Sequence, residues 1–411
     1  MRLKLDHFSI ADIWFLVPFS VLLFFLALTT TFYYSLFAGY YYIRLLWLCF
    51  LILFVRELFF IGKVNLNELL GLALILLVSY FSLYKFQRDE MMTILFVAYA
   101  MRTVDYKKVV KVSIIILSLV LIVTVIGAYA GAIQNYLEVT TSRTRYYLGF
   151  RYSLFGTALF FNICALIIYD RKNNISPYTL IGLMLINLFL YSKTDSRLSF
   201  ILTCLLIITS CVFKFNYDKI KNANWIYYIC IGSFIFALIF SFWITLKYSE
   251  NSSFLVSLDN KFGGRLHLGQ NALEDYGVNL FGQNIKYIGN GLDISGIKNT
   301  WDKYNYVDNF YIHYTQLYGL FFIVGLSLFI TKLQVKIKRK KDIYLAIILL
   351  FFAVHGIVDD LMLTIYYNMF FISTTYLMNG QLEKDKLLSI IKIVFLVLIL
   401  LLFGIRMSYT L

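Results

Sequence analysis

Residues 108–127 read KVVKVSIIILSLVLIVTVIG, an apolar run whose only charges, Lys108 and Lys111, lie near its start. A helix of about 20 apolar residues is as long as the hydrocarbon core of a bilayer is thick. The run therefore predicts a transmembrane helix. The fold class then depends on how many runs of this kind the chain contains.

The composition as a whole is that of a membrane protein. Of 411 residues, 60% are hydrophobic, and the mean hydropathy is +0.75, whereas soluble domains are about 45–50% apolar. A water-exposed surface could not be built from this chain. Aromatic residues reach 19%, and many Tyr and Trp lie at the ends of apolar runs, where membrane interfaces favour them.

Similar apolar runs lie on both sides of 108–127, and together they predict about thirteen transmembrane helices. We expect these helices near 12–32, 39–56, 67–84, 89–102, 108–127, 150–169, 178–192, 197–213, 225–246, 309–331, 343–358, 362–378 and 387–405. The sequence thus predicts an all-α, polytopic integral membrane protein, with residues 1–411 as one membrane-embedded domain. The long polar loop 247–308 is expected to be partly helical and to lie outside the cytoplasm.

The basic residues predict the orientation of these helices, because cytoplasmic connections are enriched in Lys and Arg. With a cytoplasmic N-terminus, 22 of the 37 Lys and Arg residues lie in the segments 1–11, 56–66, 102–111, 170–177, 213–224, 332–341 and 383–392. The first apolar run is too long for a signal peptide and lacks a small-residue cleavage site, so we expect it to remain as a helix. The net charge of +14 is attributed to topology, and no nucleic-acid partner is predicted.

Several kinds of chemistry are not expected. All five cysteines lie inside apolar runs, which argues against a disulfide framework or a Cys-based metal site. Four dispersed histidines without HExxH spacing also argue against a metal. There is no GxxxxGK[ST] stretch for ATP and no inverted repeat of the kind that builds secondary transporters. Neither a metal nor a cofactor is predicted.

Arginine is concentrated in outer connections, which the charge rule predicts to be poor in basic residues. Arg143, Arg145 and Arg151 lie in one outer connection, Arg197 lies in a short turn, and Arg265 lies in the long loop. Arginine binds phosphate or carboxylate through a planar fork of donors. Arginines converging from three outer segments would therefore suit a di-anionic ligand. The alternative is that they contact lipid headgroups at the interface.

The long outer loop contains a second set of signals. Residues Arg265 to Gly277 read as a short amphipathic helix that ends at Gly277. Asp308 or Asn309 is expected to cap the helix that follows the loop. Capping alone would account for Asp308; the alternative is that Asp308 orients an arginine or a substrate hydroxyl.

Three histidines lie near these outer features. His267 belongs to the amphipathic helix, and His313 lies one helical turn after Asn309. His355 is four residues before Asp359, so the two share a helix face. Ionisable groups inside a membrane are costly and often functional, but a buried structural pair is an equally good reading of His355 and Asp359.

The order of these motifs resembles a known family. A basic third outer loop is followed by Thr194-Asp195-Ser196-Arg197, then by a long fifth outer loop with Gly263-Gly264-Arg265, Leu280-Phe281-Gly282 and Asp308-Asn309-Phe310-Tyr311. This pattern is similar to the Wzy-type polysaccharide polymerases and the related O-antigen ligases, which are polytopic, lipid-linked glycosyltransferases. The resemblance covers most of the chain in topology and a small part of it in sequence.

The resemblance implies a reaction on the outer face of the bacterial cytoplasmic (inner) membrane. In this family a glycan on undecaprenyl pyrophosphate passes to the terminal sugar hydroxyl of another lipid-linked repeat unit, and lipid pyrophosphate is the leaving group. No nucleotide sugar and no metal are implied. The implied partners are the polyprenyl-pyrophosphate-linked oligosaccharide, the lipid bilayer, a flippase and a chain-length regulator.

The resemblance also implies which residues bind substrate. They are the arginines of the third and fifth outer loops, joined here by two residues of the helix junctions: Arg143, Arg145, Arg151, Arg265, Arg197 and Asn309. The family's Arg-x10-Gly spacing is met by Arg145 and Gly156. The chain departs from the family after Gly149-Phe150, where many members have His-Pro-Asn and this sequence has Arg151-Tyr152-Ser153.

An attacking hydroxyl needs a base within about 3 Å. From the sequence, His267 or His313 is the expected base and Asp308 is the alternative, because these are the ionisable groups nearest to Arg265 and to the Asp308-Asn309 motif. Arginines are the groups expected to neutralise the charge that develops on the departing pyrophosphate.

Two other functions stay open beside polymerisation of lipid-linked repeat units. A ligase of the O-antigen type would use the same donor and pass the glycan to a lipid or wall acceptor, and nothing in these residues separates the two. A lipid-linked oligosaccharide flippase or other transporter should carry charges in mid-membrane and have short outer loops. Arg44 is the main candidate within a span, and the loop 247–308 is unexpected for that class.

Overall fold

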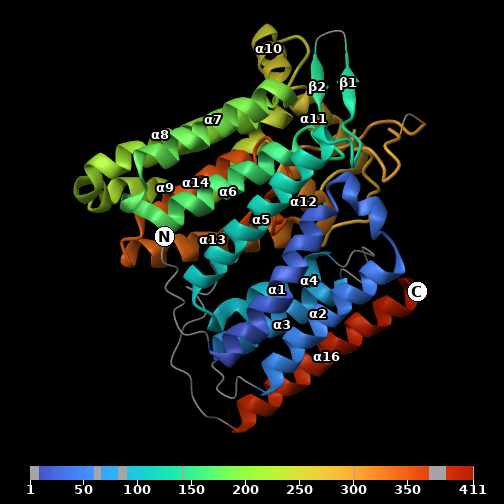
Figure 1. Ribbon diagram of the computed structural model, residues 1–411, viewed down its shortest axis with the longest axis vertical. Helices are drawn as coiled ribbons and strands as arrows, with labels where there is room; N and C mark the ends of the chain where they lie inside the picture. The colour runs from blue at the N-terminus through green and yellow to red at the C-terminus, as the bar shows by residue number, and fades with distance from the viewer. Residues whose placement is uncertain are drawn as a thin grey trace.

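The computed structural model describes residues 9–59, 66–81, 90–140, 143–299, 301–369 and 386–410 of the chain. Helices dominate this part (Figure 1). Five of them are long and apolar enough to cross a membrane: α1 (Ile10–Leu28), α5 (Tyr106–Tyr129), α8 (Arg197–Lys221), α9 (Asn224–Leu246) and α13 (Leu320–Arg339). The predicted helical class and membrane character agree with this, and the complete set of thirteen spans stays a prediction.

The first and last helices pack together, in the lower part of Figure 1. They are α1, α2 (Tyr40–Phe59), α3 (Leu66–Phe81), α4 (Glu90–Ala100) and α16 (Lys386–Thr410), and α16 lies against α3 and α2. The short 3₁₀ helices η1 (Phe32–Leu36) and η3 (Met101–Thr103) follow α1 and α4. α5 packs against α1 and against α6 (Phe155–Arg171), so it joins this group to the rest.

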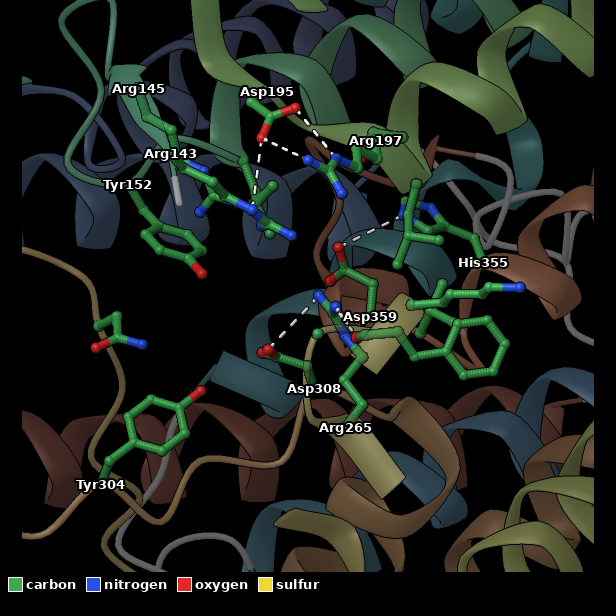
Figure 2. A pocket seen from close by; sticks show the side chains of 18 residues that line it. Arg143, Arg145, Tyr152, Asp195, Arg197, Arg265, Tyr304, Asp308, His355 and Asp359 are labelled. Atoms are coloured by element: carbon green, nitrogen blue, oxygen red, sulfur yellow. Dashed lines mark hydrogen bonds and ion pairs between the residues drawn. The ribbon is translucent and has the colours of Figure 1, made fainter. Parts of the chain in front are cut away.

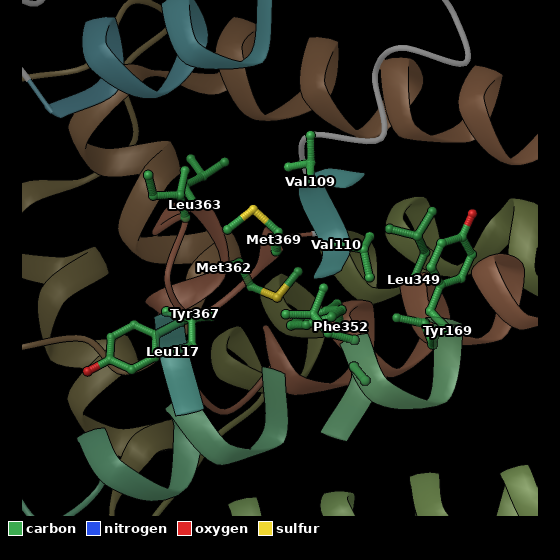
Figure 3. Close-up of a cluster of buried hydrophobic side chains, with 14 of the residues drawn as sticks. Val109, Val110, Leu117, Tyr169, Leu349, Phe352, Met362, Leu363, Tyr367 and Met369 are labelled. Carbon is green, nitrogen blue, oxygen red and sulfur yellow. The ribbon is translucent and has the colours of Figure 1, made fainter. Parts of the chain in front are cut away.

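The remaining helices surround a continuous apolar core. They are α7 (Pro177–Thr194), α8, α9, α12 (Phe310–Tyr318), α13 and α14 (Ile343–His355), with the short 3₁₀ turns η4 (Lys172–Asn174) and η5 (Leu361–Leu363). Val109, Phe352, Met362 and Met369 belong to one buried cluster (Figure 3) and are at most 4% exposed. Ile115, on the outer side of α5, is 63% exposed, as expected of a side chain that faces lipid.

The predicted cytoplasmic connections come together at one end of these helices. Lys172 forms an ion pair with Asp342 at 2.9 Å, and Lys341 donates to Asn222 at 3.0 Å. Three connections that the charge rule assigns to the cytoplasm are therefore neighbours. The predicted outer connections meet around a separate cavity, as they would if successive helices crossed the bilayer in alternate directions.

A second group of charges is buried among α2, α3, η3 and α16. Arg56 and Arg102 lie 2.8 and 2.7 Å from the Glu57 carboxylate, Arg102 lies 3.2 Å from Glu68, and Lys392 lies 4.0 Å from Glu57. All five side chains are at most 3% exposed. We call these five side chains the ionic cluster.

The predicted span 309–331 is wrong as a single helix. α12 and α13 are separate, and Gly319 lies between them with a φ of +96°. The outer loop bonds to this break, since the Leu320 amide donates to the Asn279 carbonyl at 3.0 Å. A Cβ at Gly319 would overlap the carbonyl oxygen of Leu280. Backbone from a distant segment thus interrupts a sequence whose apolar pattern reads as continuous.

The predicted span 362–378 is also wrong as an α-helix, at least through residue 369, where its described part ends. Asn162 bonds to the irregular chain there: its Nδ2 donates to the Tyr366 carbonyl at 2.9 Å, and its Oδ1 accepts from the Met369 amide at 3.3 Å. Irregular backbone is tolerated at membrane depth when protein groups bury and bond it. Residues 370–378 lie outside the described residues.

The all-α prediction also missed one pair of strands. β1 (Leu137–Val139) and β2 (Thr144–Tyr146) form an antiparallel hairpin in the outer connection before α6. The helix predicted from residue 150 consequently starts later, at Phe155. The hairpin stands beside α10 (Ser253–Lys261) and α11 (Arg265–Tyr276) at the upper end of Figure 1.

Candidate functional site

Four of the predicted arginines line one cavity of about 180 Å³ (Figure 2). A water molecule needs about 10–15 Å³ of such space, so the cavity has room for roughly a dozen water-sized groups. Six segments surround it: the β1–β2 hairpin, the chain just before α6, the α7–α8 junction, the α10–α11 turn, the long loop from Asn290 to Asp308, and the chain at the end of α14. The ionisable side chains facing it include Arg143, Arg145, Asp195, Arg197, Lys261, Arg265, Asp308, His355 and Asp359.

The hairpin supplies Arg143 and Arg145. The two strands pair with Glu138 opposite Arg145, and the Nη1 atom of Arg145 lies 3.9 Å from Oε2 of Glu138. The Nε atom of Arg143 lies 3.5 Å from Oδ2 of Asp195, at the α7–α8 junction. The hairpin therefore holds two guanidinium groups beside the α7–α8 junction.

The α7–α8 junction supplies Asp195 and Arg197. Asp195 ends α7 in the left-handed conformation, at φ 46° and ψ 39°, which Asp and Asn adopt more readily than most residues. Arg197 begins α8, and its Nε atom lies 3.2 Å from Oδ1 of Asp195. One carboxylate thus contacts two guanidinium groups, because Arg143 approaches the same Asp195. The junction retains an excess of positive charge.

The α10–α11 turn supplies Arg265. Gly263 and Gly264 turn the chain with φ values of +72° and +85°, a conformation that favours glycine. Arg265 then starts α11, and Gly277 follows its last residue, so the predicted helix from Arg265 to Gly277 is confirmed. One end of the Arg265 guanidinium donates to the Phe262 carbonyl at 2.7 Å, and the other lies 3.6 Å from Oδ2 of Asp308.

The end of the long loop brings carboxylates to the same cavity. The Phe310 amide donates to the carbonyls of Gly356 and Asp359 at 2.9 and 3.2 Å, which places Asp308 beside Asp359. His355 lies 3.4 Å from Asp359 through its Nε2 atom. Burial raises the pKa of Asp308 to about 6; the neighbouring charge of Asp359 acts in the same direction and that of Arg265 opposes it.

The cavity carries more positive than negative charge. Five basic side chains and three carboxylates face it. Burial, together with the like charges of neighbouring Arg145 and Arg197, lowers the pKa of Arg143. The Nε atoms of Arg145 and Arg265 are buried without a hydrogen-bond partner. Buried donors without partners are costly, so the arrangement favours an added anion.

Two of the predicted substrate-binding residues have structural contacts outside this cavity. Arg151 donates twice to the Thr29 carbonyl, at 3.0 and 2.6 Å, and once to the Leu292 carbonyl at 3.4 Å. It thus ties the long loop to the end of α1. Asn309 caps α12 by accepting from two amides of its first turn, and its Nδ2 donates to the Ile357 carbonyl at 2.9 Å. Asn309 is therefore the N-cap, one of the two alternatives expected from the sequence.

The two histidines expected as the base do not face the cavity either. The Nδ1 atom of His267 lies 3.0 Å from Oδ2 of Asp259, on the other side of the α10–α11 turn. His313 is 5% exposed and stacks on Tyr287 with ring centroids 4.5 Å apart. Of the three candidates for the base, Asp308 is the one that lines the cavity. The histidines are close to Arg265 and Asp308 in sequence, but α11 and α12 direct their side chains away from the cavity.

Sequence reasoning missed part of the lining. Tyr152, Tyr304, Asn290 and Lys261 face the cavity, and nothing in their local sequence distinguished them. Asp359 had a signal in its spacing from His355, which was equally consistent with a structural pair. Within the described residues, no group of three or more His, Cys, Asp or Glu side chains is arranged to hold a metal ion.

No protein-family model, no curated protein and no solved structure matches the chain. The resemblance to the polymerases and ligases therefore stays a prediction that rests on its motifs. The cavity's own chemistry is an excess of fixed cations beside Asp308, a carboxylate that can accept a proton near neutral pH.

Proposed function

We propose that this chain transfers a glycan from a polyprenyl pyrophosphate to a sugar hydroxyl, and so polymerises lipid-linked repeat units into surface polysaccharide. The observation that carries the proposal is the convergence of Arg143, Arg145, Arg197 and Arg265 on a cavity that also contains Asp308. Cations alone would suit a lipid headgroup. A carboxylate with a pKa of about 6 beside them adds the proton acceptor that a transfer reaction needs.

Pyrophosphate fits the cationic side of the cavity by charge. A pyrophosphate that joins a lipid to a sugar carries two negative charges, and five basic side chains against three carboxylates leave an excess of two positive charges. When the sugar leaves, the lipid pyrophosphate gains one more negative charge. Preorganised guanidinium groups stabilise that added charge more strongly than they stabilise the bound substrate.

The chemical step is a single displacement. The acceptor hydroxyl gives its proton to the carboxylate of Asp308 while its oxygen bonds to the anomeric carbon of the donor. The bond from that carbon to the pyrophosphate oxygen breaks, and the electron pair leaves with the lipid pyrophosphate. Asp308 lies 3.6 Å from Arg265, so the base and one of the anion-binding groups are neighbours.

The membrane arrangement belongs to the same proposal. About thirteen spans with a cytoplasmic N-terminus would put the cavity on the outer face of the bacterial cytoplasmic membrane, where lipid-linked oligosaccharides are displayed. The separation of the basic connections around Lys172 and Lys341 from the cavity supports this orientation. Labelling of single cysteines at position 141 and at position 340 from outside intact cells tests it. Only the first should react.

The direct test is the lipid-linked glycan profile of a strain that lacks the gene. A polymerase predicts that single lipid-linked repeat units accumulate and long polymer disappears. Accumulation of long lipid-linked chains would instead indicate a ligase with the same donor. An unchanged profile contradicts both functions.

The role of the arginines can be tested in the same strain. Arg265→Lys keeps the charge but loses the planar fork, so polymer synthesis should fall about tenfold or more at normal expression. Arg171→Lys is a matched control, because Arg171 is 54% exposed at the opposite end of the helices. Equal polymer length in the two variants would argue against a bidentate contact between Arg265 and pyrophosphate.

A further inference from the structure

Two kinds of side chain line the cavity, charged ones and tyrosines. Arg143, Arg145 and Arg197 lie above the cavity in Figure 2 and Arg265 lies below it, while Tyr152 and Tyr304 lie on the side away from His355. In Figure 2 the hydroxyl ends of both tyrosines turn toward Asp308. Asn290, from the Gly-rich stretch of the long loop, also lines the cavity. We call Tyr152, Tyr304 and Asn290 the tyrosine wall.

The tyrosine wall is positioned from two separate parts of the chain. Tyr152 lies just before α6, and its ring packs edge-on against Phe155 with centroids 5.6 Å apart. Tyr304 and Asn290 belong to the long loop, and Arg151 connects this loop, through the Leu292 carbonyl, to the Thr29 carbonyl at the end of α1. The Tyr152 ring is therefore held against α6, and both tyrosines line the cavity.

The two tyrosine hydroxyls remain protonated at neutral pH. Burial is the main cause that raises the pKa of both groups, and the nearby carboxylate of Asp308 adds to it. Tyr152 also contributes to the rise at Tyr304, so the two rings and Asp308 are close enough to act on one another. A protonated phenol donates and accepts hydrogen bonds, and a side-chain amide does both as well.

We infer that the tyrosine wall is a saccharide subsite that holds the acceptor sugar. A sugar ring presents an apolar C–H face and a rim of hydroxyls, which match an aromatic ring with a polar end and an amide. The positive charge of the arginines favours pyrophosphate over a neutral sugar. This inference rests on the proposed function, because it assigns a place to the second substrate of that reaction.

This assignment also places the acceptor and the donor on opposite sides of Asp308. Asp308 lies 3.6 Å from Arg265, and Tyr152 and Tyr304 lie on the other side of its carboxylate (Figure 2). A hydroxyl of a sugar bound to the tyrosine wall would therefore lie next to the carboxylate of Asp308, with the donor's pyrophosphate beyond it at Arg265. Tyr152 and Tyr304 act as positioning residues in this arrangement, and Asp308 acts on the reacting proton.

Ligand binding to the purified chain in detergent or nanodiscs distinguishes the role of the tyrosine wall from the role of the arginines. The probes are inorganic pyrophosphate and a panel of methyl glycosides of neutral and N-acetylated hexoses at millimolar concentration. The readout is the concentration that gives half the shift in the thermal unfolding midpoint. For the glycosides that bind, Tyr304→Ala and Asn290→Ala should raise this concentration about tenfold, and Tyr304→Phe should raise it about threefold. The response to pyrophosphate should stay within twofold.

Two variants serve as controls. Tyr248→Ala removes a tyrosine of the same outer region that does not line the cavity, and it should leave both responses unchanged. Arg265→Lys should weaken the response to pyrophosphate and spare the response to the glycosides. Tyr304→Phe keeps the ring, so it reports on the hydroxyl even if Tyr304→Ala fails to fold.

Two results would overturn the subsite: no glycoside stabilises the wild-type chain, or the glycosides stabilise the tyrosine-wall variants as well as the wild type. Either result leaves the pyrophosphate response, and with it the proposed donor, in place. If the wild type ignores pyrophosphate but binds a glycoside through Tyr304, the subsite stands and the proposed donor is contradicted.

Discussion

Two regions of this molecule concentrate charge, and they balance it differently. In the ionic cluster of Arg56, Glu57, Glu68, Arg102 and Lys392, the arginines contact carboxylates at 2.7 to 3.2 Å and every side chain is at most 3% exposed. In the cavity the contacts between arginines and carboxylates run from 3.2 to 3.9 Å, and the arginine side chains are 13 to 57% exposed. The first region is closed to water and the second is open to it.

The difference separates a structural role from a binding role. Arg56 uses its remaining donors on the Ala11 and Ala100 carbonyls and the Thr103 hydroxyl, so the ionic cluster offers little to a ligand. Arg102, Arg145 and Arg265 all have an Nε donor without a partner, but Arg145 and Arg265 line the cavity, whereas Arg102 is 2% exposed inside the ionic cluster. Burial of charge is therefore a poor guide to function by itself. The better guide is whether donors without acceptors line a cavity.

The largest expected effect is on transfer. Asp308→Asn keeps the shape of the side chain and removes the proton acceptor, so the rate of transfer should fall about 10²- to 10⁴-fold. The rate is measured with lipid-linked units extracted from the deletion strain. Asp302→Asn, an exposed carboxylate of the same loop, is the control and should keep its rate. A loss of less than about tenfold in Asp308→Asn would remove Asp308 from the mechanism.

The next effect is on stability, and it belongs to the other region. Glu57→Gln leaves Arg56, Arg102 and Lys392 with less negative charge in a closed interior, which should lower the free energy of unfolding by about 3–5 kcal/mol. Glu138→Gln is the matched control, since Glu138 contacts Arg145 and Lys298 at 3.9 and 3.5 Å at a partly exposed site; it should cost less than about 1 kcal/mol. If Glu57→Gln and Glu138→Gln shift the unfolding midpoint equally, the assignment of a structural role to the ionic cluster and a binding role to the cavity is contradicted.

The third effect is a pH dependence confined to the cavity. Since Asp308 must be deprotonated to act as a base and its pKa is about 6, the transfer rate should fall about tenfold per pH unit below that value. Folding raises this pKa from 3.8, so its contribution to stability is present at low pH and is lost as the pH rises through about 6. Asp308→Asn should therefore unfold at a higher temperature than wild type at pH 7, with a smaller gap at pH 4. A rate independent of pH between 5 and 7 is the contrary result.

The smallest effect is at the rim of the cavity. Arg197 is 57% exposed and shares Asp195 with Arg143, so Arg197→Gln should change the free energy of unfolding by no more than about 0.5 kcal/mol. The KM for the lipid-linked substrate should rise roughly three- to tenfold, with a weaker dependence on salt because one cation is gone. Measuring KM at two salt concentrations checks both. A large loss of stability would mean that Arg197 belongs with the structural arginines.

Part of this picture could be predicted from sequence, because the signals were local. The helix from Arg265 to Gly277 had an apolar face and a terminal glycine, and the outer arginines stood out against the charge rule. The break at Gly319 could not be predicted, since it depends on hydrogen bonds from residue 279 and its neighbours in the outer loop. The irregular chain near Met369 likewise depends on Asn162, about two hundred residues earlier in the sequence.

The tyrosine wall had no sequence signal for a different reason. Tyr152 and Tyr304 are two of 33 tyrosines, most of which fit the interface of a membrane equally well. The prediction that a histidine is the base had the opposite cause: histidine is rare in this chain, and its rarity suggested a function. His267 and His313 are near Arg265 and Asp308 along the chain, but the helices that carry them turn them toward Asp259 and Tyr287.

The position of α16 has a consequence for how the chain is made. Lys392 comes from the last described helix and lies 4.0 Å from Glu57 in α2, and α16 packs against α3. During synthesis, α2, α3 and α4 are made long before α16. Until α16 arrives, the ionic cluster lacks one of its cations and α3 lacks a neighbour. A chain cut before Lys386 would therefore lack both the Lys392 contact with Glu57 and the packing of α16 against α3.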